Sequence, residues 1–574
     1  MAKYTIEKIV AKTGQEVYRV NNYYLHSKYD PISEAGRLVE KEYKINCIHI
    51  LFGYGNGYIL DALLDKVKNE SIIIIDPLLD DGTLQVFARH MQLKNVYYWS
   101  EHHNNTLGFV ISKLANGLNL KIHVFASSNY NQIFKQEYKE ILLYIRDFQN
   151  RMQVNYNTEV QFSNEWQQNF TKNVLQIAKD NTLLSLENKF DLPVVLAASG
   201  PSLTKQLPLL KEVEQNVLII AAGSTINALL DANIEPDFVI SIDGGKWNYE
   251  HFKNLSLQNA RLIYAPYNHP GVRKSFKKQA FIFSQIGHES MGGYLYEHMG
   301  INLPIIAGGG TVAHYGVTVA GLLNSGPIAM IGQDLAYTNN QTHAQGNKFI
   351  NTVQDLKELG KDLFEVDGYN GEPVQTSREF LSMKMVFEEI AQFHKPSVPL
   401  FNCTEGGVSL RGYEQLPFKS FIEQYVDTKT YKDLSTIETI KPFKTSDGII
   451  AIYKNEVKII NDLQRSINKG LEKLNKIQHN IYFDEKTLIV LDEIEKKIEE
   501  KTKMIQIHFL IAPITYEVAN QFLPKEFETQ EETYKRSWNQ TNTLYKRLLE
   551  ALEKSKKNLQ GVIDTVENNN QELL

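Results

Sequence analysis

The chain has 574 residues, a formal charge of −6, and a composition that is 43% hydrophobic and 22% charged. This length exceeds what one hydrophobic core supports, and the mild acidity argues against a nucleic-acid-binding surface. No apolar run reaches membrane-spanning length, no signal-like stretch opens the chain, and two distant cysteines suggest neither disulfides nor a thiolate metal site, so we expect a cytoplasmic protein without a membrane segment.

Residues 1–150 are predicted to form a first α/β domain. A buried strand runs into a turn rich in glycine, and a second strand ends at an acidic residue, as at the start of a dinucleotide-binding fold. These features are the strand 47–52, the glycines Gly53, Gly55 and Gly57, the strand 71–75, and Asp76. The glycine spacing departs from G-x-G-x-x-G, so the domain either binds a nucleotide or keeps the fold without the site.

The second predicted domain begins with a short β-branched strand, residues 194–197, followed by a loop of small residues. The loop consists of Ser199, Gly200, Pro201 and Ser202. Proline suits the first position of a helix, where exposed backbone N–H groups favour an anion. We therefore expect either a phosphate seat built from main-chain amides or an ordinary tight turn between a strand and a helix.

This second domain spans residues 155–430. Apolar strands alternate with helices, which indicates a mostly parallel sheet covered on both faces. The strands are predicted at 194–197, 217–221, 238–242, 262–265, 305–307, 328–331 and 400–403. Ligands of such sheets bind beyond the carboxyl ends of the strands, where small, polar or acidic residues collect. The candidates there are Gly223, Ser224, Asn227, Asp243, Gly244, Tyr267, Asn268, Gly309, Gly310, Thr311, His314, Asp334 and Glu405.

A helical segment is predicted just ahead of the first strand of this domain. Trp166, Asn169 and Asn173 stand at helical spacing in it. We expect them to form a polar helix face against the edge of the sheet; the alternative is that the amides contact a ligand.

Residues 445–574 are rich in Lys, Glu and Asn, and apolar residues recur at steps of three and four, which predicts amphipathic helices. Examples are Ile460, Leu463, Ile467, Leu544, Leu548 and Leu552. These helices either stabilise a homo-oligomer or provide a docking surface for a protein substrate. The predicted fold class is thus α/β: a smaller α/β domain, a Rossmann-like mostly parallel central domain, and an α-helical domain.

Several motifs together resemble the motility accessory factors, bacterial flagellin glycosyltransferases that transfer pseudaminic or legionaminic acid. The motifs are residues 199–203, Asp237 with residues 240–243, residues 331–337 with His343 and Ala344, and residues 402–407. The central motifs are also similar to those of Rossmann-like bacterial sialyltransferases, in which a G-P-S-L loop lies under the phosphate of a CMP-sugar. The resemblance covers residues 160–415 by motif and the whole chain by layout.

The resemblance implies a CMP-activated nonulosonic acid as the donor, a Ser or Thr hydroxyl of flagellin as the acceptor, and no cofactor or metal. Backbone amides and hydroxyls stabilise the leaving phosphate, and a base removes the acceptor's proton. Candidate bases are His314, His343, Asp334 and Glu405, with Asp243 as a base, a ribose contact or, with Asp237, a metal ligand. We expect Gly200→Val to abolish CMP binding and to leave the fold largely intact.

Two other functions stay open at this point. The central domain also resembles archaeal hydroxymethylpterin pyrophosphokinases, which need Mg²⁺ to neutralise a triphosphate. The chain has no glycine-lysine phosphate loop, which counts against that reaction. A non-catalytic scaffold that holds flagellin through its helical tail predicts no nucleotide binding.

Overall fold

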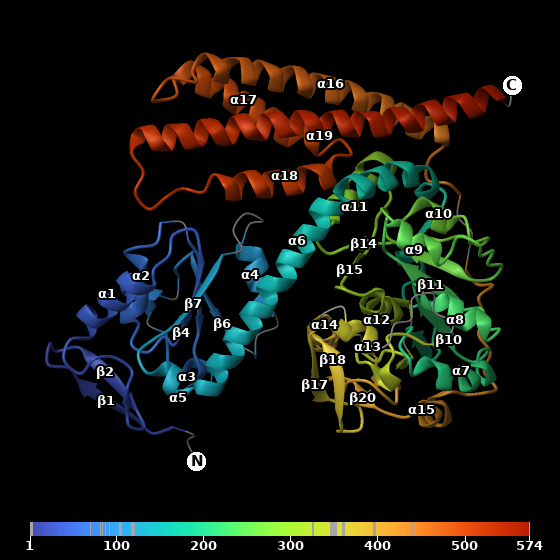
Figure 1. Ribbon diagram of the computed structural model, residues 1–574, viewed down its shortest axis with the longest axis horizontal. Helices are drawn as coiled ribbons and strands as arrows, with labels where there is room; N and C mark the ends of the chain where they lie inside the picture. Colours follow the sequence, from blue (N-terminus) through green and yellow to red (C-terminus); the bar gives the residue numbers. More distant parts are fainter. Residues whose placement is uncertain are drawn as a thin grey trace. The chain divides into compact units, whose positions relative to one another are not determined.

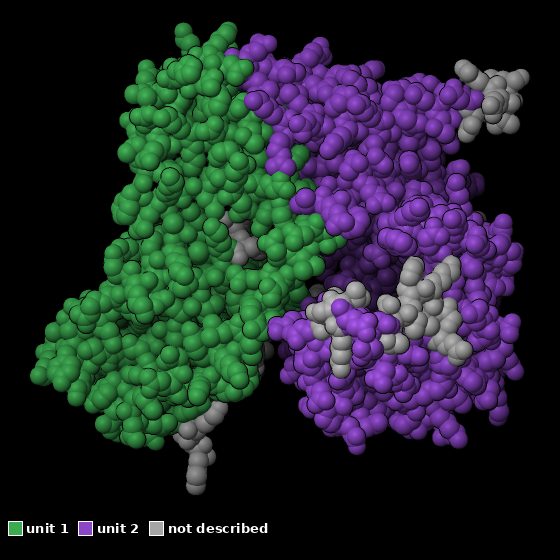
Figure 2. Space-filling view, in the orientation of Figure 1, with its two compact units in different colours: residues 1–158, 473–487, 513–545 green, residues 159–472, 488–512, 546–574 purple. Residues whose placement is uncertain are grey.

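The computed structural model describes residues 4–572 apart from 69, 81, 83, 87, 91, 101, 103–105, 116–120, 324–325, 345–352, 359–361, 394–397 and 438–440. The chain divides into two compact units (Figures 1 and 2). Unit 1 comprises residues 1–158, 473–487 and 513–545, and unit 2 comprises residues 159–472, 488–512 and 546–574. Both units therefore contain helices of the predicted C-terminal segment.

Unit 1 is built on a parallel four-stranded sheet of order β6-β5-β4-β7. The strands are β4 (Ile48–Phe52), β5 (Ile72–Ile75), β6 (Val96–Trp99) and β7 (Ile122–Ala126), which confirms the two that the sequence predicts. An antiparallel meander precedes them, formed by β1 (Ile6–Val10), β2 (Glu16–Val20) and β3 (Tyr23–Tyr24).

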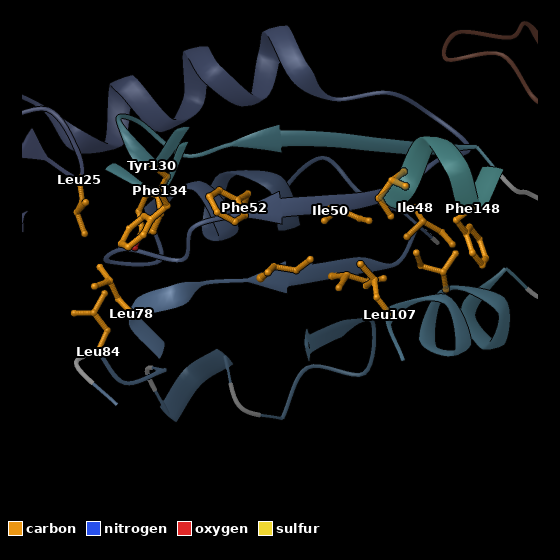
Figure 3. Packing of buried hydrophobic residues seen from close by; sticks show 14 of the residues in the cluster. Leu25, Ile48, Ile50, Phe52, Leu78, Leu84, Leu107, Tyr130, Phe134 and Phe148 are labelled. Carbon is orange, nitrogen blue, oxygen red and sulfur yellow. The ribbon is translucent and has the colours of Figure 1, made fainter. Parts of the chain in front are cut away.

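Helices cover both faces of this sheet. They are α1 (Pro31–Glu42), α2 (Tyr58–Leu64), α3 (Pro77–Asp80), α4 (Leu107–Leu114), α5 (Tyr130–Ile133) and the first part of α6 (Lys135–Ile177). Successive side chains of a strand point to opposite faces. Ile50 and Phe52 accordingly share a buried cluster with Leu107 of α4 and Phe148 of α6 (Figure 3), while Leu51 packs in the cluster that contains residues of α1 and α2.

Unit 2 contains a nine-stranded parallel sheet of order β20-β19-β16-β9-β10-β11-β12-β13-β8. The bounds are β8 (Asn181–Thr182), β9 (Val194–Ala197), β10 (Leu218–Ala222), β11 (Phe238–Ser241), β12 (Arg261–Tyr264), β13 (Phe281–Ile282), β16 (Ile328–Ile331), β19 (Leu400–Asn402) and β20 (Glu414–Gln415). From β9 the chain adds β10 to β13 on one side and β16, β19 and β20 on the other, as in a Rossmann-like fold.

One predicted strand does not join this sheet. Residues 305–307 contain β15 (Ile305–Ile306), which pairs with β14 (Ser284–Gln285) in a separate two-stranded sheet. Ile305 is 55% exposed, so this short apolar run is not a core strand, and the prediction that it belongs to the central sheet is wrong. A second small sheet is formed by β17 (Leu363–Asp367) and β18 (Pro373–Ser377).

The helices between these strands include a central one, α12 (Val312–Leu323), that contacts β9, β10 and β11. Gly316 allows the close approach, because a Cβ there would lie 2.6 Å from the Leu196 side chain. The others are α7 (Leu203–Glu212), α8 (Thr225–Asp231), α9 (Lys246–Glu250), α10 (Pro270–Arg273), α11 (Glu289–Met299), α13 (Val353–Glu358), α14 (Arg378–Phe393) and α15 (Phe418–Tyr425).

The C-terminal segment is helical, as its spacing predicts. Its helices are α16 (Ser446–Lys476), α17 (Glu485–Thr502), α18 (His508–Gln521) and α19 (Gln530–Glu572). Ile460, Leu463 and Ile467 of α16 are each at most 1% exposed, because they form the apolar stripe of the helix. Across the described residues, no helix combines the length and the apolar character needed to span a bilayer.

Candidate active site at the carboxyl edge of the central sheet

The order of strand addition reverses at β9, which lies between β16 and β10. Open α/β sheets bind ligands beyond the carboxyl ends of their strands at such a point. Ala198 and Ser199 follow β9, Gly223 follows β10, and Gly332 follows β16. The Ser199 hydroxyl lies 3.4 Å from that of Ser224, so the ends of β9 and β10 present adjacent polar groups.

The loop after β9 is closed by a carboxylate of the protein itself. Asp334, which follows β16, accepts hydrogen bonds from the Ser202 N–H at 3.2 Å and the Ser202 hydroxyl at 2.7 Å. The Gly200 N–H donates to the Gly332 carbonyl at 2.7 Å. A phosphate seat of free amides in this loop is therefore contradicted for Gly200 and Ser202, because their donors are used internally.

Asp334 is itself enclosed, at 2% exposure. Burial raises the pKa of its carboxyl group, and the hydrogen bonds from Ser202 act in the opposite direction. The group ties the loop after β16 to the loop that contains Pro201, which precedes α7 and does not start it. A role of Asp334 as a base stays a prediction.

Gly200→Ala is expected to destabilise the fold by about 1–3 kcal/mol, whereas Gly310→Ala leaves stability unchanged. A Cβ at Gly200 collides with the Asp334 carboxylate and lies 2.5 Å from the Gly332 carbonyl oxygen, while nothing lies within 4 Å of one at Gly310. The expectation that Gly200→Val spares the fold is wrong for the same reason. Thermal melting of both variants tests this, and an unchanged melting temperature for Gly200→Ala contradicts it.

Two further predicted bases have structural roles. The Glu405 carboxylate accepts the Phe418 N–H at 2.9 Å and so caps the start of α15. His314 is fully buried: its Nε2 lies 2.9 Å from the Met383 carbonyl, and its Nδ1 accepts the Thr311 N–H at 3.3 Å. These hydrogen bonds give both groups a structural role, and a catalytic role for Glu405 or His314 stays a prediction.

His343 lies in a segment that passes the end of β9. The N–H of the next residue, Ala344, donates to the Ser199 carbonyl at 2.8 Å. The half-buried His343 ring has its Nδ1 3.0 Å from the Thr342 hydroxyl. This placement keeps His343 near the candidate site, and its role as a base stays a prediction.

The glycine loop ahead of α12 lies beside the end of β10. A Cβ at Gly223 would be 3.6 Å from Val312, the first residue of α12. Gly310 is exposed, and among the described residues no hydrogen bond from the N–H of Gly309 or Gly310 is found. The start of α12 thus differs from the loop after β9, and the predicted contacts of Gly309, Gly310 and Thr311 with a ligand stay a prediction.

Asp243, after β11, carries an open carboxylate. The residue is exposed, and its carboxylate accepts no hydrogen bond from the part of the chain that the structure describes. Enough protein surrounds it that loss of solvation raises its pKa. Its backbone carbonyl accepts the Asn248 amide at 2.8 Å and the Asn268 amide at 3.3 Å. The loop is therefore fixed while the carboxylate stays accessible.

Most predicted amide contacts instead bind the backbone. The Asn169 amide donates to the Gly244 carbonyl at 2.9 Å, and the Asn173 amide donates to the Asn268 carbonyl at 2.7 Å. This confirms the expectation of a polar face of α6 against the sheet edge. The Asn227 amide donates to the His251 carbonyl at 3.4 Å.

Four aromatic rings gather next to Asp243, and the sequence alone finds only part of this group. Trp166 of α6 lies 4.9 Å from Tyr267 and 5.5 Å from Phe509 of α18, between ring centroids. His288 lies 5.4 Å from both Tyr267 and Phe509. A Cβ at Gly244 would be 2.7 Å from the Trp166 ring, so glycine is needed for this packing. No sequence signal points to Phe509, because only tertiary structure brings α18 to this edge.

The glycine turn of unit 1 is also closed. Asp76 is 1% exposed and accepts the Tyr54 N–H at 2.6 Å, the Leu78 N–H at 2.8 Å and the Tyr130 hydroxyl at 2.7 Å. A Cβ at Gly53 would collide with the Tyr130 ring. Of the two readings of this domain, the geometry favours the fold without the nucleotide site, because the acidic group is not available to a ribose.

Residues 168–340 match the family model of 6-hydroxymethylpterin diphosphokinase MptE-like proteins. This stretch runs from α6 through β16. It contains most of the parallel sheet of unit 2, so the chain belongs to the class of proteins with a Rossmann-like α/β domain. No curated protein matches the chain by sequence. Within the described residues, no three His, Cys, Asp or Glu side chains converge in a way that suits a metal ion.

The fold of the whole chain is similar to a solved structure, the MAf glycosyltransferase from Magnetospirillum magneticum AMB-1. The TM-score is 0.53 at 14% sequence identity, and the match covers 98% of this chain and 95% of that chain. The α/β fold class is confirmed, and the resemblance to motility accessory factors is confirmed at the level of the fold.

Proposed function

We propose that this protein is a glycosyltransferase that moves a nonulosonic acid of the pseudaminic or legionaminic type from a CMP-activated donor to a Ser or Thr hydroxyl of flagellin. The likeness to the MAf glycosyltransferase along nearly the entire chain is the observation that carries the proposal. The proposal places the enzyme in the cytoplasm, where flagellin is made, requires no cofactor or metal, and allows a homo-oligomer.

The proposed reaction uses two parts of the carboxyl edge. The acceptor oxygen attacks the anomeric carbon of the donor sugar, the bond from that carbon to the phosphate oxygen breaks, and CMP leaves with the electron pair. Asp243 takes the acceptor's proton, because its open carboxylate has a raised pKa and no internal partner among the described residues. The start of α12 stabilises the phosphate through the backbone N–H groups of Gly309 and Gly310 and the hydroxyl of Thr311.

A second candidate function is pyrophosphoryl transfer to a small molecule, which the MptE-like match over residues 168–340 favours. That reaction requires a divalent cation to neutralise the triphosphate. A flagellin-binding scaffold without catalysis is the third possibility. The three differ in which nucleotide they bind and in the need for Mg²⁺.

Thermal-shift measurements with CMP, CTP and ATP, each with Mg²⁺ and with EDTA, separate these functions. We expect CMP to stabilise the protein equally in both conditions, because amides and not a metal hold its phosphate. Stabilisation by ATP only with Mg²⁺ supports the pyrophosphokinase instead, and no response to any nucleotide supports the scaffold.

Mass spectrometry of flagellin from a strain that lacks this gene identifies the missing sugar by its mass.

A further inference from the structure

We propose that Gln285 and Glu159 bind the hydroxyl groups of a sugar ring that lies against the aromatic rings around Trp166, next to the carboxylate of Asp243. This inference rests on the proposed function, since it assigns the sugar part of the donor to one place in the site. It adds a residue of β14 and a residue of α6 that the motifs do not include.

Gln285 is the observation that points to a ligand. It is 3% exposed, and its Oε1 accepts a hydrogen bond from the Tyr267 hydroxyl. Its Nε2 has no hydrogen-bond partner in the described part of the chain. A buried amide donor without a partner costs about 1–3 kcal/mol. A ligand oxygen beside the Tyr267 hydroxyl removes this cost.

Two carboxylates lie beside the rings. Asp243 directly precedes Gly244, where a Cβ would be 2.7 Å from the Trp166 ring, and Glu159 is on the helix that carries Trp166. Glu159 is half-buried on α6, and loss of solvation raises its own pKa. It precedes Trp166 by seven residues, which is about two helical turns, so both side chains lie on one face of the helix. No hydrogen bond or ion pair to either carboxylate is found among the described residues.

The rings form the apolar part of the subsite. Trp166, Tyr267, His288 and Phe509 pack with centroid distances of 4.9–5.8 Å. Burial lowers the pKa of His288 to about 4, so the ring is uncharged at neutral pH and does not neutralise the carboxylates. Aromatic surface with a few oriented polar groups is typical of small-molecule sites.

This combination selects the chemistry of the ligand. Ionised carboxylates only accept hydrogen bonds, so they bind hydroxyl groups and repel a phosphate. The amide of Gln285 supplies a donor to a ring or acyl oxygen. The groups therefore fit the polyhydroxylated, uncharged face of a sugar and leave the phosphate to the start of α12.

Isothermal titration with CMP and with CMP-N-acetylneuraminic acid tests the subsite in Gln285→Ala and Glu159→Gln. Each loses a hydrogen bond of about 1 kcal/mol, so we expect about fivefold weaker binding of the CMP-sugar and unchanged binding of CMP. Glu165→Gln on the same helix is the matched control and leaves both affinities unchanged, and thermal melting verifies that each variant folds. Equal effects on both ligands, or no effect on the CMP-sugar, overturn the subsite.

A second arm separates this inference from the proposed function. Saturation-transfer NMR with free N-acetylneuraminic acid is expected to show contact with its ring protons in the wild type and less contact in Gln285→Ala. Sugar contact without CMP binding refutes the proposed donor but supports the subsite. CMP binding without sugar contact supports the proposed donor but overturns the subsite.

Discussion

Asp243→Asn is expected to lower the turnover of the transferase by about 10²- to 10⁴-fold. Asparagine keeps the size of the side chain but does not accept the proton of the acceptor hydroxyl. The change leaves the loop intact, because the Asn248 and Asn268 amides bind the backbone carbonyl of residue 243 and not its side chain. Release of CMP from the activated donor, with flagellin present, measures the rate.

The pH dependence of the same variant has a definite sign. The pKa of Asp243 is raised by loss of solvation, so the wild-type rate falls when the pH drops through a value above the ordinary pKa of an aspartate. The Asp243 carboxylate is exposed and accepts no hydrogen bond from the described residues, so its replacement removes no internal contact. Asp243→Asn therefore loses activity without losing stability. Asp231→Asn, at an exposed site, is the matched control, and wild-type turnover in Asp243→Asn contradicts the role of this residue.

Asp76→Ala is expected to destabilise unit 1 by about 3 kcal/mol or more. Removal of this carboxylate leaves the Tyr54 and Leu78 N–H groups and the Tyr130 hydroxyl without their acceptor in a buried place. Hydrogen exchange of a peptide that covers residues 53–58 measures the loss of stability at the glycine turn itself. A melting curve is less suitable, because it combines the unfolding transitions of the two units.

Asp30→Ala provides the comparison for this variant. Asp30 caps α1 at the protein surface by accepting the Ser33 N–H at 3.0 Å, and removal of such a cap costs about 1 kcal/mol. Equal protection in Asp76→Ala and wild type would show that Asp76 does not hold the glycine turn closed.

The sequence predicts the sheets well because burial dictates their residues. Residues 194–197 and 328–331 coincide with β9 and β16, whose side chains are all buried. The short run 305–307 has the same apolar character, but Ile305 is exposed and the run pairs with β14 in a separate two-stranded sheet. An apolar triplet alone does not distinguish a strand of the central sheet from a strand that lies outside it.

The roles of the acidic residues were harder to predict. Asp334 and Ser202 are 132 residues apart, and they meet only because β16 pairs beside β9. The spacing of residues along the chain does not reveal the order of strands in the sheet. Asp334 and Glu405 therefore have the sequence pattern of catalytic groups, although both form hydrogen bonds to other loops of the protein. Asp243 follows the same pattern, and what distinguishes it is the lack of a partner among the described residues.

Phe509 belongs to the C-terminal helices, yet its ring packs on Trp166 and Tyr267 at the carboxyl edge. In the same stretch, the Gln506 carbonyl accepts the Gln167 amide of α6 at 2.9 Å and the Ser555 hydroxyl of α19 at 2.6 Å. A fragment that stops at residue 445 therefore lacks Phe509, one of the four rings beside Asp243. Shortening the chain from its C-terminus removes part of the candidate site together with the helices.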